Sequence, residues 1–462
     1  MNAVSDAVSG YPSRRTAWYA VFILMLCYTL SYADRQILAF LVGPLKQDLH
    51  ISDTQVGFLQ GLAFALFYTV AGLPMGMLAD RFKRRTVIAV GVFLWSLMTS
   101  LSSVARSFWS LAAARMGVGI GEATLSPCAF SLIADSFPKE RLSSALSVYT
   151  MGIQLGSGLA LIVGGAVAQA VSHLPPVELP VFGHVSAWRV TFLIVGAPGL
   201  VMALLLFTVR EPIRRALLLG VGGAVTPPGL RDAFKHLRAR GRSVVGLAVM
   251  IACQATCNYA LLGWGPEFFG RVHQWPKDTT GLVLGLITLA CGCIGLFVGG
   301  RLSDYWNRKG VHEGALRVGL ISLIGVAVTL TPAMMLPDVR WTVALLVPAV
   351  FFIGLPIGCA YAAVQLIFPN QVRGLASAVV IFAVALVGLG VGAQLPGAFN
   401  DHLFHNGQMV GYSISLTVLI ASVVGMCAVA LTFAPYRRDY QAVHRPGISQ
   451  PPCESGRLQP GG

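Results

Sequence analysis

The amino-acid sequence predicts an all-α integral membrane protein whose twelve transmembrane helices form two halves of six. Three observations predict this class. The composition is 55% hydrophobic and only 11% charged, apolar runs long enough to span a bilayer recur along the chain, and a charged motif reappears about half a chain later. A soluble chain of 462 residues would carry far more charge.

Twelve apolar runs are long enough to cross a bilayer, which takes about 20 residues. The first run is too long for the core of a signal peptide, and no small-residue cleavage site follows it, so we expect it to remain in the protein. The predicted spans cover residues 17–44, 54–79, 86–105, 108–134, 143–171, 187–209, 244–269, 279–303, 316–336, 341–367, 374–398 and 410–434.

Basic residues are unevenly distributed between the predicted loops. Most of the 33 Lys and Arg residues lie in the two tails and in the loops that follow even-numbered spans. Because basic loops stay in the cytoplasm, we expect a multi-pass protein of the inner (plasma) membrane with both termini cytoplasmic. The formal net charge of +14 then reflects this topology, and we expect no nucleic-acid partner.

The longest predicted loop, residues 210–242, is basic and follows the sixth span. It separates a cytoplasmic tail (1–16) and a six-span half (17–209) from a second half (243–434) and a Pro- and Gly-rich tail (435–462), which we expect to be disordered. Residues 229–242 fit an amphipathic helix on the inner leaflet. They also fit a plain basic linker, which the positive-inside rule favours.

The loops after the second and eighth spans carry the same motif, Gly-x3-Asp-x3 followed by two basic residues. Either loop alone would fit a charged helix end with basic flanks. Its duplication at matching positions predicts two related halves, which is an architecture of many secondary transporters. The copies run from Gly76 through Asp80, Arg81 and Arg84 to Arg85, and from Gly300 through Asp304 and Arg308 to Lys309.

Charged residues inside predicted spans are costly and usually mark a pathway. Asp34 lies in the first span, about 15 Å below its outer edge, and Arg115 lies in the fourth span, about 10 Å below that edge. Glu122 is two turns further on, on nearly the same helix face as Arg115. Arg35 points about 100° away from Asp34. The four charges therefore predict a polar track through the first half.

The four charges of this track indicate proton exchange at buried carboxylates. Arg115 cannot release its proton, so we expect it to act as a fixed positive charge. A carboxylate beside it stays ionised and can accept a proton when the pair separates. Glu122 has fewer evident partners, so we expect desolvation to favour its neutral form. Asp34 and Glu122 are therefore candidate proton carriers, and Arg115 would pair with one and then with the other. Arg35 is a possible accessory residue. The alternative is an ion pair that only locks two spans together.

The second half has no acid or base deep within a predicted span. A cavity with one charged and one apolar wall suits an amphipathic or anionic organic solute, whose head group would meet Arg115, although Asp34 and Glu122 would equally accept a cation. The polar residues of the second half either line this cavity or form hydrogen bonds between helices. They are Gln254, Thr256, Asn258 and Tyr259 in the seventh span, and Tyr361 and Gln365 in the tenth, and the predicted cavity residues among them are Gln254, Asn258, Tyr361 and Gln365.

Several motifs resemble those of the major facilitator superfamily. The loop from Gly76 to Arg85 resembles its signature, with Lys83 in place of the usual glycine. Two further stretches resemble its fourth-span motif and its glycine-rich fifth span, in which small residues permit close helix approach. They are Arg115-x3-Gly119-x-Gly121-x-Ala123, and Gly152-x3-Gly156-Ser-Gly158 followed by Gly164-Gly165.

Residues 17–212 resemble the Spinster family of this superfamily, in its bacterial form. The resemblance implies a major-facilitator-type bundle, alternating access, a solute of lysophospholipid or sphingolipid type, proton coupling, and the same roles for Asp34, Arg115 and Glu122. The matching stretches are Tyr32-Ala-Asp34-Arg35-x2-Leu-Ala, Ala79-Asp80-Arg81, Gly117-Val-Gly-Ile-Gly-Glu122-Ala, Ser126-Pro127 and Trp188-Arg189-x2-Phe192.

The resemblance also implies a cytoplasmic gate, because the signature loop of the superfamily braces one half against the other. Asp80 would cap the facing end of span 11, where the helix dipole favours an anion. A basic residue of the loop would reach Asp135 or Glu140, although topology signalling alone is the alternative. The predicted gate comprises Gly76, Asp80, Arg81, Arg84, Arg85, Asp135, Gly300 and Asp304.

The expected function is secondary active transport of an amphipathic small molecule or lipid across the bilayer, together with protons, by a monomer. A proton-coupled multidrug exporter or an organic-anion transporter is the alternative within transport. A lipid-modifying membrane enzyme is an alternative of another class, through His273-x4-Asp278 on a short outer loop, and a transport-dead sensor would need an appended signalling domain.

We expect no enzyme activity, no cofactor and no metal. The chain lacks a Walker-type phosphate loop, which argues against ATP-driven transport within it. Cys253 and Cys257 share a helix face without a His or carboxylate cluster, so we interpret them as packing residues.

Overall fold

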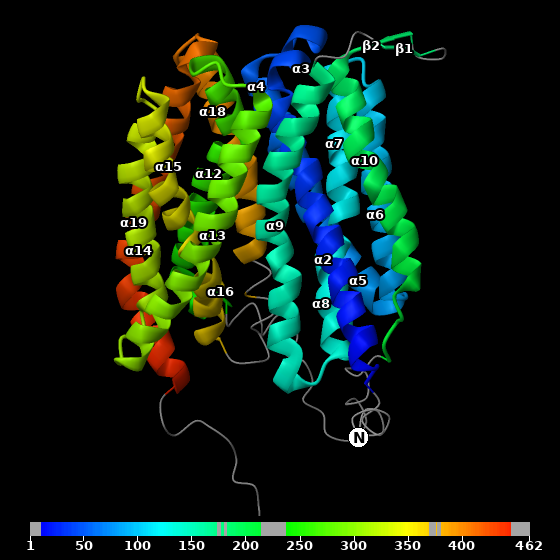
Figure 1. Cartoon of the computed structure of the whole chain (residues 1–462). Coiled ribbons are helices and arrows are strands. Elements are labelled where there is room, and N and C mark those ends of the chain that lie inside the picture. Colours follow the sequence, from blue (N-terminus) through cyan, green and yellow to red (C-terminus); the bar gives the residue numbers. More distant parts are fainter. Residues whose placement is uncertain are drawn as a thin grey trace, which may run out of the picture.

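The computed structural model describes residues 11–172, 177–179, 183–213, 237–368, 376 and 380–444, which form a tall bundle of helices (Figure 1). These residues include 12 helices that are long and apolar enough to cross a membrane, the number that the sequence predicts. The prediction of an all-α membrane bundle is confirmed, apart from one short β-hairpin that the sequence did not predict.

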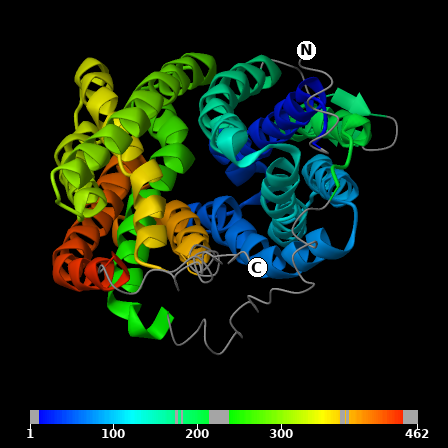
Figure 2. The ribbon, with the colours of Figure 1, turned by 90° about the horizontal axis from the view of Figure 1, so that it is seen from below.

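The spans fall into two groups, one from each half of the sequence, as the view along the bundle shows (Figure 2). The first group contains α2 (Arg14–Gln36) with η1 (Ile37–Phe40), α4 (Asp53–Gln60) with α5 (Leu62–Arg81), α6 (Arg84–Leu101) with η2 (Ser102–Val104), α7 (Phe108–Glu122) with α8 (Leu125–Ser136), α9 (Lys139–Ser172), and α10 (Ala187–Leu205) with η3 (Leu206–Thr208). The second contains α12 (Gly241–Val272), α13 (Lys277–Arg308), α14 (Gly314–Ala333), α15 (Val339–Gly354) with α16 (Ile357–Leu366), η5 (Val384–Val391) with α18 (Gly392–Ala398) and η6 (Phe399–Leu403), and η7 (Gly407–Met409) with α19 (Val410–His444).

The two ends of the bundle are distinct. One end carries the short helix α3 (Val42–Leu49) and the hairpin, in which β1 (Val177–Leu179) pairs antiparallel with β2 (Gly183–Val185), with Glu178 opposite His184 (Figure 1). We call it the hairpin end. Helix α2 begins and α19 ends at the opposite end, which we call the termini end.

The predicted tails and linker are only partly described. Residues 214–236 of the linker, with most of the stretch predicted to be amphipathic, and residues 445–462 lie outside the described residues. Helix α19 continues past residue 434, where the predicted span ends, to His444, so the expected disorder from residue 435 is wrong for this segment. The helix continues because Tyr436 is buried there and its hydroxyl donates to the carbonyl oxygen of Ala363 at 3.2 Å.

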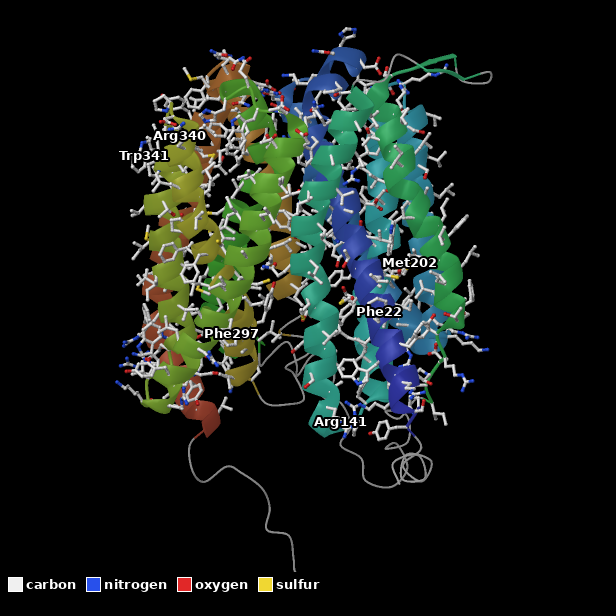
Figure 3. The ribbon with its side chains drawn as sticks, in the orientation of Figure 1. Phe22, Arg141, Met202, Phe297, Arg340 and Trp341 are labelled. Carbon is white, nitrogen blue, oxygen red and sulfur yellow. The ribbon has the colours of Figure 1, made fainter. Side chains whose placement is uncertain are left out.

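Large apolar side chains point outward from the bundle, as a surface that faces lipid requires. Phe22, Phe297 and Trp341 are examples, and each exposes more than half of its surface (Figure 3). Polar atoms of the helix backbone are satisfied within the helices, so this apolar exterior is compatible with a hydrocarbon environment.

Glycines bring the two halves into backbone contact toward the hairpin end. A Cβ atom at Gly165 of α9 would lie 2.4 Å from the carbonyl oxygen of Lys277, and one at Gly281 of α13 would lie 2.3 Å from that of Leu161. Toward the termini end, a Cβ atom at Gly300 of α13 would meet no other atom of the described chain within 4 Å. The halves are therefore packed tightly together at the hairpin end.

Candidate functional site

The four predicted charges lie in the interior of the first half. Asp34 and Arg35 stand in the last turn of α2, just before the tighter turn η1. Arg115 stands in the middle of α7, and Glu122 is the last residue of that helix, where the chain breaks before α8. Asp34, Arg115 and Glu122 expose 3%, 0% and 2% of their surface. The sequence predicted one continuous fourth span, and the break places Glu122 at a helix end.

Glu122 has two partners on α2. Its Oε2 accepts hydrogen bonds from Nε of Arg35 at 2.8 Å and from Nη2 of the same guanidinium, and Oγ of Ser31 donates to the same oxygen. The expectation that Glu122 lacks partners is therefore wrong. Arg35, predicted as an accessory, is its ion-pair partner, because its long side chain reaches α7 although its Cα faces away from Asp34.

Aromatic rings surround the Arg35 guanidinium. Its central carbon lies 4.9 Å from the ring centre of Tyr32, 4.6 Å from that of Phe64 and 5.3 Å from that of Tyr68. The ring of Phe64 also lies 5.8 Å from the guanidinium carbon of Arg115. Ring faces attract cations, so the ring of Phe64 stabilises both guanidinium groups.

Asp34 and Arg115 are neighbours, but their charged groups do not form an ion pair in this part of the structure. Nη1 of Arg115 donates to the backbone carbonyl oxygen of Asp34 at 3.4 Å, and Nε and Nη2 of Arg115 have no hydrogen-bond partner among the described residues. The Asp34 carboxylate accepts one hydrogen bond, from Oγ1 of Thr99 on α6 at 3.3 Å. The predicted Asp34–Arg115 pair is thus replaced by a main-chain contact.

A small cavity lies between the two halves beside Arg35. Its volume is about 20 Å³, enough for one water molecule. Gln60 at the end of α4 donates through Nε2 to the carbonyl oxygen of Gly263 on α12 at 3.2 Å, which fixes one wall. The residues that line it are Arg35, Gln36, Ala39, Gln60, Tyr259, Leu262, Gly263, Leu389 and Ala393.

The polar residues of the second half were predicted either to line the cavity or to form hydrogen bonds between helices. Gln254 is buried and donates to the backbone carbonyl oxygens of Phe352 and Ile353 at 3.4 and 3.3 Å, so it joins helices instead of lining the cavity. Asn258 is partly exposed, as is Tyr361 on α16, whereas the side chain of Gln365 is outside the described part. Tyr259 was absent from the predicted cavity residues, although its place beside Asn258 in a polar stretch was a usable signal.

At the termini end, one arginine of the predicted gate organises the first half. Arg84 is buried and forms ion pairs with Asp135 and with Glu211, whose Oε1 lies 2.8 Å from its Nε, and it donates to Oγ of Ser131 at 2.9 Å. The expected contact with Asp135 is confirmed, and Glu211 was missed. These partners all belong to the first half, so the contact joins α6, α8 and the end of the sixth span.

The remaining gate residues are described only in part. Arg81 and Asp304 are exposed, and Arg85 donates to the backbone carbonyl oxygens of Phe207 and Val209 at 3.3 and 3.0 Å. A Cβ atom at Gly76 would meet no other described atom within 4 Å. The side chains of Asp80 and Glu140, and residues 369–375 and 377–379 before η5, lie outside the described residues, and the predicted cap of span 11 with them.

The profile of the Major Facilitator Superfamily matches residues 24–393. The "MFS-type efflux pump" of Mycolicibacterium smegmatis (strain ATCC 700084 / mc(2)155) is 32% identical over 92% of this chain and 94% of the pump. "Protein spinster" of Drosophila melanogaster is 30% identical over 64% of this chain, and the "Sphingosine-1-phosphate transporter SPNS2" of Xenopus tropicalis is 28% identical over 69%. These matches span 47% and 60% of the two relatives.

The fold has relatives among solved structures. A bacterial homolog to the human lysosomal transporter Spinster, in an inward-facing and unoccupied conformation, superposes with a TM-score of 0.76 at 25% identity, over 93% of this chain and 99% of that chain. A D-xylose-proton symporter superposes with a TM-score of 0.63 at 19% identity, over 88% and 96% of the two chains, and shares the fold.

The described residues form a bundle of 12 candidate spans with the fold of a membrane transporter, and neither its family nor its fold is that of an enzyme. The chain belongs to the major facilitator superfamily, as a Spinster-like member.

The Arg84 contacts predict a large effect on stability. Arg84→Ala removes the guanidinium that both Asp135 and Glu211 contact, and removal of one partner from a buried ion pair costs roughly 3–5 kcal/mol. We expect a clearly lower melting temperature of the purified protein, measured by intrinsic fluorescence. Arg81→Ala, at an exposed position of the same loop, is the matched control and should change stability by about 0.5 kcal/mol or less. Equal melting temperatures for the two variants would contradict the assignment.

Proposed function

We propose that this transporter couples proton movement to the transport of an amphipathic, lipid-like solute of lysophospholipid or sphingolipid type by alternating access. The observation that carries the proposal is the unequal pairing of two buried carboxylates: Glu122 has an arginine partner, whereas Asp34 has a single hydroxyl. Such a site can hold a proton on one carboxylate while the other stays ionised.

The protonation states follow from the contacts. An ionised carboxylate buried without a cationic partner is costly, so the neutral acid is the favoured form of Asp34 in this conformation. The Thr99 hydroxyl suits both forms, because a hydroxyl can donate to a carboxylate or accept from an acid. The guanidinium of Arg35 compensates the charge of Glu122.

Arg115 is the group that receives Asp34 after proton loss. Its guanidinium already contacts the backbone of Asp34, and two of its nitrogens, Nε and Nη2, lack partners in the described chain. A rotation of the Asp34 side chain would therefore create an ion pair between spans 1 and 4. Proton binding and release at Asp34 would switch this contact, with Arg35 and Glu122 as the constant pair beside it.

Several features support a lipid-like solute. Two guanidinium groups lie in the first half, and the residues of the second half that line the cavity beside Arg35 are uncharged. This combination suits an anionic head group with an apolar chain. The Spinster-like relatives include a protein named as a sphingosine-1-phosphate transporter. The similarity to a protein named as an efflux pump favours a second candidate, a proton-coupled multidrug exporter.

We also propose the placement of the protein in the cell. The uneven distribution of the 33 basic residues supports an inner-membrane monomer whose termini end faces the cytoplasm. Because the halves are packed together at the hairpin end, the conformation would be inward-facing, which is also the conformation of the solved bacterial Spinster homolog. Asp80, Asp304 and the basic residues beside them would brace the termini end in the opposite conformation.

Uptake by proteoliposomes tests the proposed solute. Purified protein is compared with empty liposomes for a lysophospholipid, a sphingoid phosphate and a cationic dye, each with and without a pH gradient. We expect gradient-dependent movement of one of the two lipids, because their anionic heads match the arginines. Movement of the dye alone would overturn the lipid proposal in favour of a multidrug exporter.

Substitution of the carboxylates tests the coupling. Asp34→Asn and Glu122→Gln should each lower gradient-driven transport roughly tenfold or more, which corresponds to about 1.4 kcal/mol. Solute exchange without a gradient should persist in Asp34→Asn, because exchange needs no net proton movement. Asp278→Asn, at an exposed acid in the first turn of α13, is the control. The coupling proposal is wrong if both variants keep normal gradient-driven transport at normal expression.

A further inference from the structure

A groove lies between spans 1 and 6 on the outer surface of the first half. Its volume is about 410 Å³, which is in the usual range of ligand pockets. Figure 3 labels Met202 of this groove and, nearer the termini end, Phe22. The lining residues, all apolar except one threonine, are Leu26, Thr29 and Leu30 of α2 and Pro198, Val201 and Met202 of α10.

The groove faces the surroundings of the bundle and not the central charges. Val201 exposes 59% of its surface, and none of the four central charges lines the groove. The hydroxyl of Thr29 donates to the carbonyl oxygen of Met25 at 3.0 Å, within its own helix. The groove therefore offers an apolar surface to a hydrocarbon environment.

The groove exists because its two helices pack against different neighbours. A Cβ atom at Gly199 of α10 would lie 2.9 Å from Cβ of Ser96, so this glycine lets α10 approach α6 closely. A Cβ atom at Gly156 of α9 would lie 3.0 Å from Cα of Thr29, so α2 lies close to α9 in the same way. A proline inside a helix kinks it, and Pro198 lies at this level of α10. The two helices are thus held apart along the groove.

The two helices meet again at the termini end. The hydroxyl oxygens of Tyr19 and Thr208 lie 2.6 Å apart, and Thr208 donates its own proton to the carbonyl oxygen of Leu205, so Tyr19 is the donor between them. Tyrosine is frequent where a membrane meets water, and this contact therefore marks the level of the lipid head groups. Leu26 lies seven residues further along α2, about 10 Å deeper. The groove is therefore at the depth of acyl chains.

One arginine extends the groove face of α2 to the termini end. At 100° per residue, Arg15 lies within about 20° of Leu26 and about 40° of Tyr19, whereas Arg14 points about 100° away from Arg15. Both arginines are exposed. Arg15 therefore lies below the groove, and its neighbour Arg14 does not.

A second arginine lies at the same end of α10. Arg210 is exposed and follows Thr208, the partner of Tyr19, by two residues. Within the described residues, neither Arg15 nor Arg210 forms an ion pair with a carboxylate. Two cations are therefore available beside the open end of an apolar groove.

This combination of charge and shape fits an anionic phospholipid. Basic residues beside a pocket between transmembrane helices bind anionic head groups, and the apolar groove suits a hydrocarbon chain. The rise from Arg15 to Leu26 is about 17 Å, close to the roughly 15 Å of hydrocarbon in one leaflet. A phospholipid whose head group lies at the arginines would therefore reach the groove with its chain.

We propose that this groove holds one acyl chain of a two-chain anionic phospholipid, whose head group binds Arg15 and Arg210. The phospholipid is a resident of the leaflet at the termini end and not the transported solute. Leu30 lies one turn before Asp34, so an occupied groove would support the helix that carries the coupling site. The proposal requires that the bundle lie in a membrane, but it depends neither on proton coupling nor on the proposed solute.

Native mass spectrometry of the purified protein tests the head-group contact. The protein in detergent is titrated with phosphatidylglycerol, which is anionic, or with phosphatidylcholine, which carries no net charge. We expect one phosphatidylglycerol to bind more tightly than phosphatidylcholine. Arg15→Gln should weaken its binding about fivefold, which is about 1 kcal/mol at 1.4 kcal/mol per tenfold. Arg14→Gln is the matched control and should leave the affinity unchanged.

A second pair of variants tests the groove itself. Val201→Trp fills the groove from an exposed position of α10, and we expect about a fivefold weaker binding of phosphatidylglycerol. Val328→Trp makes the same change at an exposed valine of α14, outside the groove, and should have no effect. All four substituted positions are on the surface, so the variants are expected to fold.

Three results would overturn the proposal. The first is equal affinity for the two lipids, and the second is unchanged binding of phosphatidylglycerol in either Arg15→Gln or Val201→Trp. The third is its displacement by an equal concentration of a lysophospholipid, which would make the groove a solute site. Loss of affinity in Arg14→Gln equal to that in Arg15→Gln would indicate a general charge effect and would also contradict the site. Failure of proton-coupled uptake would leave these measurements unaffected.

Discussion

The structure depends on how an apolar bundle accommodates buried charge. Glu122 ends α7 inside the first half, and the guanidinium of Arg35 reaches it from α2, enclosed by the rings of Tyr32, Phe64 and Tyr68. Because a charge in hydrocarbon needs a partner, this pair ties spans 1 and 4 together and orders the aromatic residues around it. Asp34 keeps only the contact from the Thr99 hydroxyl among the described side chains, so under the proposed coupling it is the carboxylate that exchanges a proton.

Two groups of buried charges lie at different levels of the bundle. The central group, Asp34, Arg35, Arg115 and Glu122, lies within the first half and is the proposed coupling site. At the hairpin end, charges cross between the halves: Asp53 of α4 accepts from Arg271 of α12 at 2.8 Å, and Asp401 of η6 accepts from the backbone N–H of Thr54 at 2.6 Å. Between them lies the small cavity lined by Arg35, Gln60 and Tyr259. A movement that separates Gln60 from Gly263 would therefore connect the central charges to the hairpin end.

Much of this organisation could be predicted from the sequence, for a physical reason. Span number follows from apolar length, and the cost of buried charge singles out Asp34, Arg115 and Glu122 without any structure. Pairing could not be predicted, because helical spacing gives the direction of a Cα–Cβ bond but not the reach of a side chain such as Arg35. The break after Glu122 was also hidden within one apolar run. Asp53 and Arg271 were missed because charges near helix ends are ordinary in membrane proteins.

We propose that Asp34 holds a proton while Glu122 is ionised in the conformation described. Infrared difference spectra of the purified protein at neutral pH test it directly, by comparing wild type with Asp34→Asn and with Glu122→Gln. We expect Asp34→Asn to remove the C=O stretch of a protonated carboxylic acid, and Glu122→Gln to remove a carboxylate band. A protonated-acid band lost in Glu122→Gln, with only a carboxylate band lost in Asp34→Asn, would contradict it.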